Sequence, residues 1–240
     1  AGGDKLYVDD VFSTYLYTGN GGTQTINNGI DLDGEGGLVW IKARNVAIQP
    51  ILVDTTMPKN VRYAALSSDR ASALGADESD MTSFNSNGFT LQNYQGTTNG
   101  NTNTHASWTF RKAPKFFDVV TFTAGTSSNR RISHSLGSAP GMILLKANES
   151  RNWSVYHRSL GRSAGAYLNL TNAAFTSANA WGTSDPTATD FGFNEAGWAT
   201  SGKTQTAYVF AHDAGGFGDD GEQDVISCGS FTGDGSYADV

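Results

Sequence analysis

Residues 117–146 read FDVVTFTAGTSSNRRISHSLGSAPGMILLK, with one apolar run at 119–123 and a second at 142–146. The β-branched and aromatic residues in these runs favour strands, whereas the Gly, Ser and Asn residues between them favour turns. The same order occurs earlier in the chain, where Gly36-Gly37 precedes the run Leu38-Val39-Trp40-Ile41-Lys42. This stretch therefore predicts paired strands and points to an internal repeat.

A true repeat must keep its register through a whole unit, and the spacing of matching residues tests this. The separations are 105 from Tyr17 to Phe122, 104 from Lys42 to Lys146, 102 from Val53 to Val155, Leu66 to Leu168 and Phe89 to Phe191, and 100 from Trp108 to Tyr208 and Phe110 to Phe210. The change is slow and in one direction, as small loop deletions would produce. We infer two tandem repeats.

The register divides the chain into three predicted segments. These are a first β-sandwich repeat at 1–113, a second at 114–216, and a linker with the opening strand of a third repeat, or a strand-exchange segment, at 217–240. Pro114 marks the first boundary because proline cannot donate a hydrogen bond within a central strand. A repeat of about 100 residues can bury a core of its own, so we expect modules in series that form a stiff rod.

Composition favours an all-β fold with little helix, because Gly is abundant at 29 residues and charged residues make up only 16%. The predicted strands are 14–18, 38–42, 50–54, 62–67, 88–92, 105–111, 118–123, 141–146, 152–157, 165–170, 190–194 and 204–211. Short strands at this spacing predict tandem antiparallel β-sandwich modules of a jelly-roll or lectin-like kind. Residues 68–80 are either a single helix or a long polar loop.

Charge and cysteine content exclude several classes of function. The net charge is −7 and Lys and Arg are hardly clustered, which argues against nucleic acid as a partner. One cysteine, Cys228, excludes an internal disulfide framework and a four-cysteine zinc site. No run approaches the roughly 20 apolar residues of a membrane span, so we expect no membrane insertion.

Three aromatic residues are candidates for carbohydrate binding. Trp181, Trp198 and Tyr94 lie in loop-like segments beside Asn, Gln, Asp or Glu. An exposed ring can stack on a sugar face while neighbouring amides hydrogen-bond its hydroxyls. The alternative is that these rings pack on loop edges or against the neighbouring module.

Acidic turns and histidines are weaker candidates for chemistry. Asp31, Asp33 and Glu35 could supply the oxygen ligands that calcium prefers, although the spacing departs from the full calcium-loop pattern. Calcium is therefore the one cofactor we consider, and solvated turns are the alternative. His157 is the best single candidate for a catalytic histidine, against a strand-end histidine that bonds the backbone. Because no converging catalytic set is evident, we expect no catalytic residues and no enzyme.

Several motifs together resemble a domain of unknown function that is repeated in structural proteins of tailed, often marine, bacteriophages. They are Tyr17-Thr18-Gly19-Asn20-Gly21, 37–45, 83–89, 133–143, Trp153-Ser154-Val155-Tyr156-His157 and 207–213. The resemblance implies a tail, fibre or appendage protein, located in a virion or outside the cell. It implies no active-site residues.

The leading expectation is thus a non-enzymatic structural and adhesive protein, with other virion or filament subunits as partners and homo-oligomers expected. One alternative is a lectin-like module that binds a host-surface glycan. Another is a filament subunit assembled by terminal strand addition through Val225, Ile226, Cys228 and Phe231, since an unpaired strand seeks a sheet edge. A polysaccharide depolymerase comes last.

Overall fold

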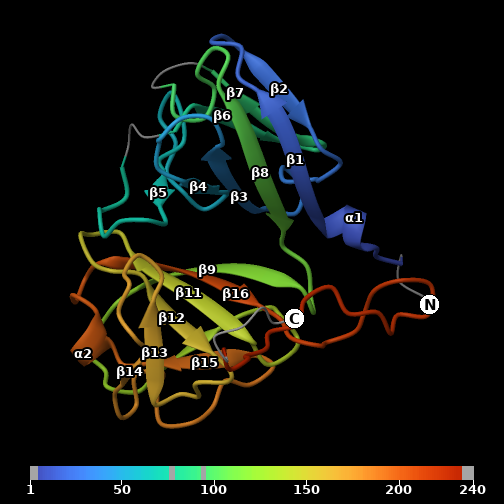
Figure 1. The fold of residues 1–240 in the computed structure, drawn as a ribbon. Coiled ribbons are helices and arrows are strands. Elements are labelled where there is room, and N and C mark those ends of the chain that lie inside the picture. The colour runs from blue at the N-terminus through green and yellow to red at the C-terminus, as the bar shows by residue number, and fades with distance from the viewer. Residues whose placement is uncertain (1–4, 76–78, 93–95, 234–240) are drawn as a thin grey trace.

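The computed structural model describes residues 5–75, 79–92 and 96–233, which form two lobes joined near residue 113 (Figure 1). The protein is nearly all β, with 39% strand and 4% helix in several antiparallel sheets. Among the described residues the two α-helices are α1 (Val8–Val11) and α2 (Glu195–Trp198), of 4 residues each. The all-β prediction is confirmed.

The first lobe is built on a five-stranded antiparallel sheet in the order β1-β8-β3-β4-β5. Its strands are β1 (Phe12–Thr18), β3 (Gly37–Ala43), β4 (Ile51–Asp54), β5 (Leu66–Ser67) and β8 (Thr104–Arg111). A three-stranded sheet in the order β2-β7-β6 packs on one face of it. The strands of this smaller sheet are β2 (Gln24–Asn27), β6 (Met81–Asn85) and β7 (Gly88–Leu91).

The second lobe is built on a six-stranded antiparallel sheet in the order β14-β13-β12-β11-β16-β9. Its strands are β9 (Phe117–Thr123), β11 (Met142–Ala147), β12 (Ser154–His157), β13 (Ala164–Tyr167), β14 (Phe175–Thr176) and β16 (Thr204–Phe210). A two-stranded sheet of β10 (Arg130–Ser133) and β15 (Asp190–Phe193) packs on one face.

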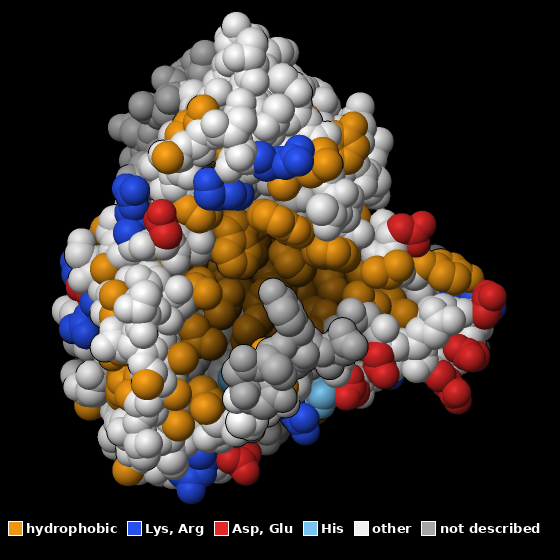
Figure 2. Space-filling view, in the orientation of Figure 1, with side chains coloured by type: hydrophobic (Ala, Val, Ile, Leu, Met, Phe, Trp, Pro, Cys, Tyr) orange, Lys and Arg blue, Asp and Glu red, His pale blue; other side chains and the backbone are white. Residues whose placement is uncertain are grey.

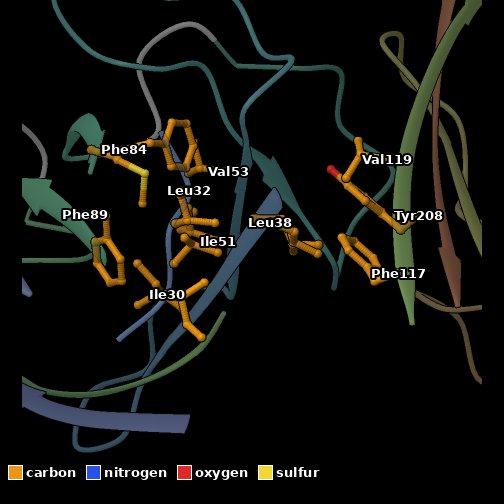
Figure 3. Close-up of a cluster of buried hydrophobic side chains, with 14 of the residues drawn as sticks. Ile30, Leu32, Leu38, Ile51, Val53, Phe84, Phe89, Phe117, Val119 and Tyr208 are labelled. Carbon is orange, nitrogen blue, oxygen red and sulfur yellow. The ribbon is translucent and has the colours of Figure 1, made fainter. Parts of the chain in front are cut away.

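Both faces of each large sheet are apolar. Successive side chains along a strand point to opposite faces, so Val39 of β3 points away from Leu38. On one side of the five-stranded sheet, Ile51 and its neighbours lie toward Phe89 of the small sheet (Figure 3). On the other side Leu38 faces Phe117 of the second lobe (Figure 3). The lobes therefore meet through their large sheets.

We call the contact between the two large sheets the apolar junction. The ring of Phe110 lies 5.4 Å from that of Phe117 and 5.6 Å from that of Phe210, measured between centroids. Two hydrogen bonds also cross it: the Tyr208 hydroxyl donates to Asp54 Oδ2 at 2.7 Å, and Trp153 Nε1 donates to the Ser67 carbonyl oxygen at 2.9 Å.

The larger core cluster continues from the first lobe into the second, whereas a smaller cluster lies under β10 and β15. The expectation of separate beads along a stiff rod is therefore wrong for this pair, because a shared core joins the lobes. The order of layers is small sheet, large sheet, large sheet, small sheet. Each large sheet thus has its own small sheet on one face and the other lobe on the opposite face.

Every predicted strand range overlaps an observed strand. The sequence does not predict β2, β6, β10 or β14. β2 and β10 each bury a single apolar side chain, Ile26 and Ile132, and β6 carries a register shift after Met81. The described part of 68–80 contains no helix; Gly75 instead bridges back to Ala65.

Candidate functional site

Trp181 is part of the second-lobe core. Its side chain is 2% exposed and its ring packs edge-on against Tyr156 and at a tilt against Phe193. A sugar must reach the face of a ring to stack on it. Burial therefore removes Trp181 from the candidate carbohydrate-binding residues. The polar neighbours in its sequence suggest a loop, but this loop folds back onto the core.

The other two aromatic candidates have different outcomes. Trp198 ends α2, is half-buried, and stacks on Phe175 of β14 with ring centroids 4.7 Å apart. One face of its ring is therefore occupied by protein. Tyr94 lies outside the described residues.

The acidic turn proposed for calcium is organised by its own hydrogen bonds. Asp31 Oδ1 accepts from the backbone N–H of Gly34 at 2.8 Å, as an Asp side chain in a turn commonly does. Across residues 5–75, 79–92 and 96–233, no group of three His, Cys, Asp or Glu side chains is placed to hold a metal ion. Calcium binding by Asp31, Asp33 and Glu35 stays a prediction.

His157 behaves as a strand-end histidine. Its Nδ1 accepts from the backbone N–H of Ser159 at 3.2 Å. Burial, Arg158 and His212 together lower its pKa below the ordinary value, the burial effect being largest. The geometry matches the alternative of a histidine that bonds the backbone.

The C-terminal segment docks on the second lobe without joining a sheet. Asp213 N–H donates to the Ile226 carbonyl oxygen at 3.0 Å, and Cys228 N–H donates to His212 Nδ1 at 3.0 Å. Val225 and Ile226 are half-buried, Cys228 is buried, and Phe231 is 70% exposed. No strand is assigned within 224–233, so the described part of the predicted third-repeat strand is not paired in a sheet.

Hydrophobic side chains gather in a hollow between the lobes (Figure 2). Phe12, Trp40, Met142 and Val155 are partly buried and pack against the larger core cluster. The apolar junction therefore extends outward to the molecular surface.

A buried histidine lies at the end of the large sheet of the first lobe. His105 is fully buried, and its ring stacks on Tyr17 with centroids 4.9 Å apart. Neither ring nitrogen has a hydrogen-bond partner among the described atoms. Burial lowers the pKa of His105 below 6.5, although the nearby Asp80 carboxylate opposes the shift. The folded state therefore favours the neutral ring.

We predict that His105→Gln makes stability less dependent on pH. Because the folded pKa of His105 is lowered, its contribution is complete above about pH 6.5 and is lost as the pH falls below that value. Glutamine is chosen because it occupies the equivalent position of the second lobe. There Gln205 faces Phe122, as His105 faces Tyr17 in the first lobe. Urea unfolding between pH 8 and pH 5 should show a smaller loss in the variant. Parallel curves for the two proteins would contradict the assignment.

The second lobe carries a crevice that sequence reasoning misses, and we call it the second-lobe crevice. Its volume is about 540 Å³. It is lined by Ser138, Ala139, Pro140, Tyr156, Arg158, Gly161, Asp185, Pro186, His212, Asp213 and Ala214. These residues come from four separate parts of the chain and form no motif, so only the fold brings them together.

The crevice contains both ionic and hydroxyl groups. His212 Nε2 lies 3.2 Å from Asp213 Oδ2, and Asp185 lies 3.7 Å from the guanidinium of Arg162 at the edge. Arg158 is exposed, and no side chain or carbonyl of the described residues bonds to its guanidinium. This crevice is the candidate functional site.

The comparison with known proteins identifies the family of the chain and gives no further information about its function. No curated protein and no solved structure matches the chain. No helix in the described part of the chain is long and apolar enough to cross a membrane. A family described as a domain of unknown function (DUF7483) matches residues 8–239 and so includes both lobes and the C-terminal segment. Since the match covers nearly the whole sequence, the chain belongs to this DUF7483 family.

Proposed function

We propose that the chain is a non-enzymatic structural and adhesive protein, built from two tandem β-sandwich modules that pack into one unit. The observation that carries the proposal is the shared strand order of the two large sheets. In the first lobe β1-β8-β3-β4-β5 are neighbours, and in the second β9-β16-β11-β12-β13 follow the same order. The small sheets also correspond, because β2 pairs with β7 as β10 pairs with β15.

Cross-strand register supports the duplication at the level of residues. Trp40 faces Trp108, and the residues at their repeat positions, Leu144 and Tyr208, face each other. Similarly, Ile26 faces Phe89 in the first lobe and Ile132 faces Phe191 in the second. A duplication explains why the paired positions agree in strands that are far apart in sequence.

The strand alignment corrects two of the sequence matches. Trp40 faces Leu52, and its equivalent Leu144 faces Val155, so Val155 corresponds to Leu52 and not to Val53. A slip of one residue along a strand moves a side chain to the opposite face. By the same reasoning Leu66, which faces Leu52, corresponds to Ala166, which faces Val155, in place of Leu168.

The layer order supports a closed pair. A third module could not join by the same junction, since both faces of each large sheet are already occupied. The family match from residue 8 to residue 239 also treats the two lobes and the C-terminal segment as one unit. In this proposal, longer assemblies form through other surfaces of the pair.

The resemblance to phage structural proteins leads us to place the pair in a virion or an extracellular appendage. The test is quantitative mass spectrometry of purified particles or appendages from the natural source, after washing in high salt. The proposal expects the chain at a fixed ratio to known structural subunits. Recovery of the chain only in the cell extract would contradict it.

A second candidate is a filament subunit assembled by strand addition. The described residues 224–233 belong to no sheet, and Phe231 is exposed. β1 is a sheet edge and carries Leu16, which is 58% exposed, so an unpaired strand could add there. Deletion of residues 224–240 should abolish assembly detected by light scattering. Unchanged assembly after the deletion would exclude this candidate.

A further inference from the structure

Arg158 of the second-lobe crevice forms no ion pair with any residue that the structure describes. Arg158 follows β12 and lines the crevice, and its guanidinium has no bond to the described residues. Asp185 has a basic neighbour in Arg162, whereas Asp213 Oδ2 lies 3.2 Å from Nε2 of His212, a ring that is charged only when protonated. An arginine guanidinium recognises a carboxylate through two parallel hydrogen bonds. Arg158 is therefore the group of the crevice that could hold an anionic substituent.

Tyr156 supplies a fixed hydroxyl beside this cation. Its side chain is 6% exposed, with the ring packed edge-on against Trp181, yet the residue lines the crevice. No described group bonds to its hydroxyl. Burial raises the pKa of Tyr156, and Asp185 adds to the increase while Arg158 opposes it. The hydroxyl therefore stays protonated at neutral pH and can donate.

The remaining polar groups are suited to a ligand with several hydroxyls. Asp185 and Asp213 present carboxylate oxygens, which accept from hydroxyl groups. Pro140 and Pro186 add apolar surface to the lining. A volume of about 540 Å³ lies within the range of small-molecule sites. Polar acceptors, apolar walls and a guanidinium that pairs with no described residue together match a sugar with an acidic substituent.

The equivalent crevice of the first lobe serves as an internal comparison. It is lined by Glu35, Lys112 and Ala113, and also by Phe117 and Asp118 of the second lobe. There Lys112 Nζ forms an ion pair with Asp118 Oδ1 at 3.2 Å. The lysine of the first-lobe crevice is thus paired within the chain.

The described part of the C-terminal segment, up to residue 233, repeats a backbone bond of the first lobe without its ion pair. The bond from Asp213 N–H to the Ile226 carbonyl repeats the bond from Ala113 N–H to the Phe117 carbonyl, at 3.0 Å in both places. When these two bonds are aligned, Ile226 corresponds to Phe117, and Ser227 therefore corresponds to Asp118. A serine brings no carboxylate, so the ion pair between Lys112 and Asp118 has no counterpart at this position of the second lobe.

We propose that the second-lobe crevice binds a sugar that carries a carboxylate. Arg158 holds the carboxylate, Tyr156 donates from the buried wall, and Asp185 and Asp213 accept from ring hydroxyls. This inference deepens the adhesive part of the proposed function and assigns it to one module. The proposed tandem architecture does not depend on whether this crevice binds a sugar.

The test is a titration of the full chain with a glucuronate tetrasaccharide, followed by backbone amide shifts of Ala139, Gly161 and Ala214. Glucose tetrasaccharide and inorganic phosphate are the other two arms. We expect shifts with the glucuronate ligand alone, weakening as salt is added because the recognised group is charged. Shifts of equal size with phosphate would show a plain anion site and overturn the sugar assignment. No shift with glucuronate would overturn the proposal entirely.

Matched variants locate the binding. Arg158→Gln should weaken binding about tenfold or more, since a charge-assisted pair is lost, and Tyr156→Phe should weaken it several-fold. Arg151→Gln is the control, because Arg151 is exposed, lies outside the crevice, and already pairs with Glu149. Equal affinity in Arg158→Gln and the control would contradict the assignment. If the chain occurs in purified particles but does not bind the glucuronate ligand, this inference is refuted and the proposed structural function still holds.

Discussion

Replacing Trp153 with alanine is expected to lower the free energy of unfolding by about 3–5 kcal/mol, the largest loss of any single change considered. Trp153 is fully buried in the apolar junction, and its ring stacks on Tyr208 with centroids 6.1 Å apart. Its Nε1 donates to the Ser67 carbonyl of the first lobe. The change removes a large side chain and one bond between the lobes.

Urea unfolding of the variant measures this effect, and Trp153→Phe separates its two parts. Phenylalanine keeps most of the ring and loses the N–H donor, so we expect a loss of about 1–3 kcal/mol, mainly from the unpaired carbonyl of Ser67. Trp198→Ala is a control away from the junction, since Trp198 is half-buried and packs within the second lobe. A loss below about 1 kcal/mol in Trp153→Ala would show that the junction is not tightly packed.

Replacing Asp54 with alanine is expected to cost about 2–4 kcal/mol. Asp54 is fully buried and accepts from the Tyr208 hydroxyl at 2.7 Å, from Thr56 N–H at 2.8 Å and from Thr56 Oγ1 at 2.6 Å. Burial raises the pKa of Asp54, and these hydrogen bonds oppose the shift. Alanine leaves the donors without a partner in a site closed to water.

A double-mutant cycle with Tyr208→Phe isolates the bond that crosses the junction. If Asp54 and Tyr208 interact across it, the double variant should be more stable than the sum of the single losses implies, by about 0.5–3 kcal/mol. Asp54→Ala with Thr56→Val is a control cycle within the first lobe. Strict additivity for Asp54 and Tyr208 would mean that this hydrogen bond does not hold the lobes together.

The sequence predicts the strands better than it predicts their packing. Runs such as Leu38 to Lys42 are buried on both faces, so local composition already identifies them as strands. β10 carries two arginines and buries only Ile132 among its side chains, so its pattern resembles a loop. Its strand conformation depends on pairing with β15, which lies far away in sequence.

The residues of the candidate site also could not be identified from local sequence. Trp181 has the polar neighbours of an exposed loop, yet its ring is in the core because tertiary packing overrides local composition. Arg158 has no feature in the sequence that separates it from other surface arginines. Its significance comes from its place in the crevice and from having no ion-pair partner in the described part of the chain, which only the arrangement of β12 and the loops around it reveals.

Small-angle X-ray scattering of the full chain in solution tests most directly whether the two lobes form one unit with a shared core. A compact pair of this length should have a radius of gyration of about 18 Å and a pair-distance distribution with a single maximum. A distinctly larger radius with two separate maxima, as from two beads on a free joint, would contradict the shared core.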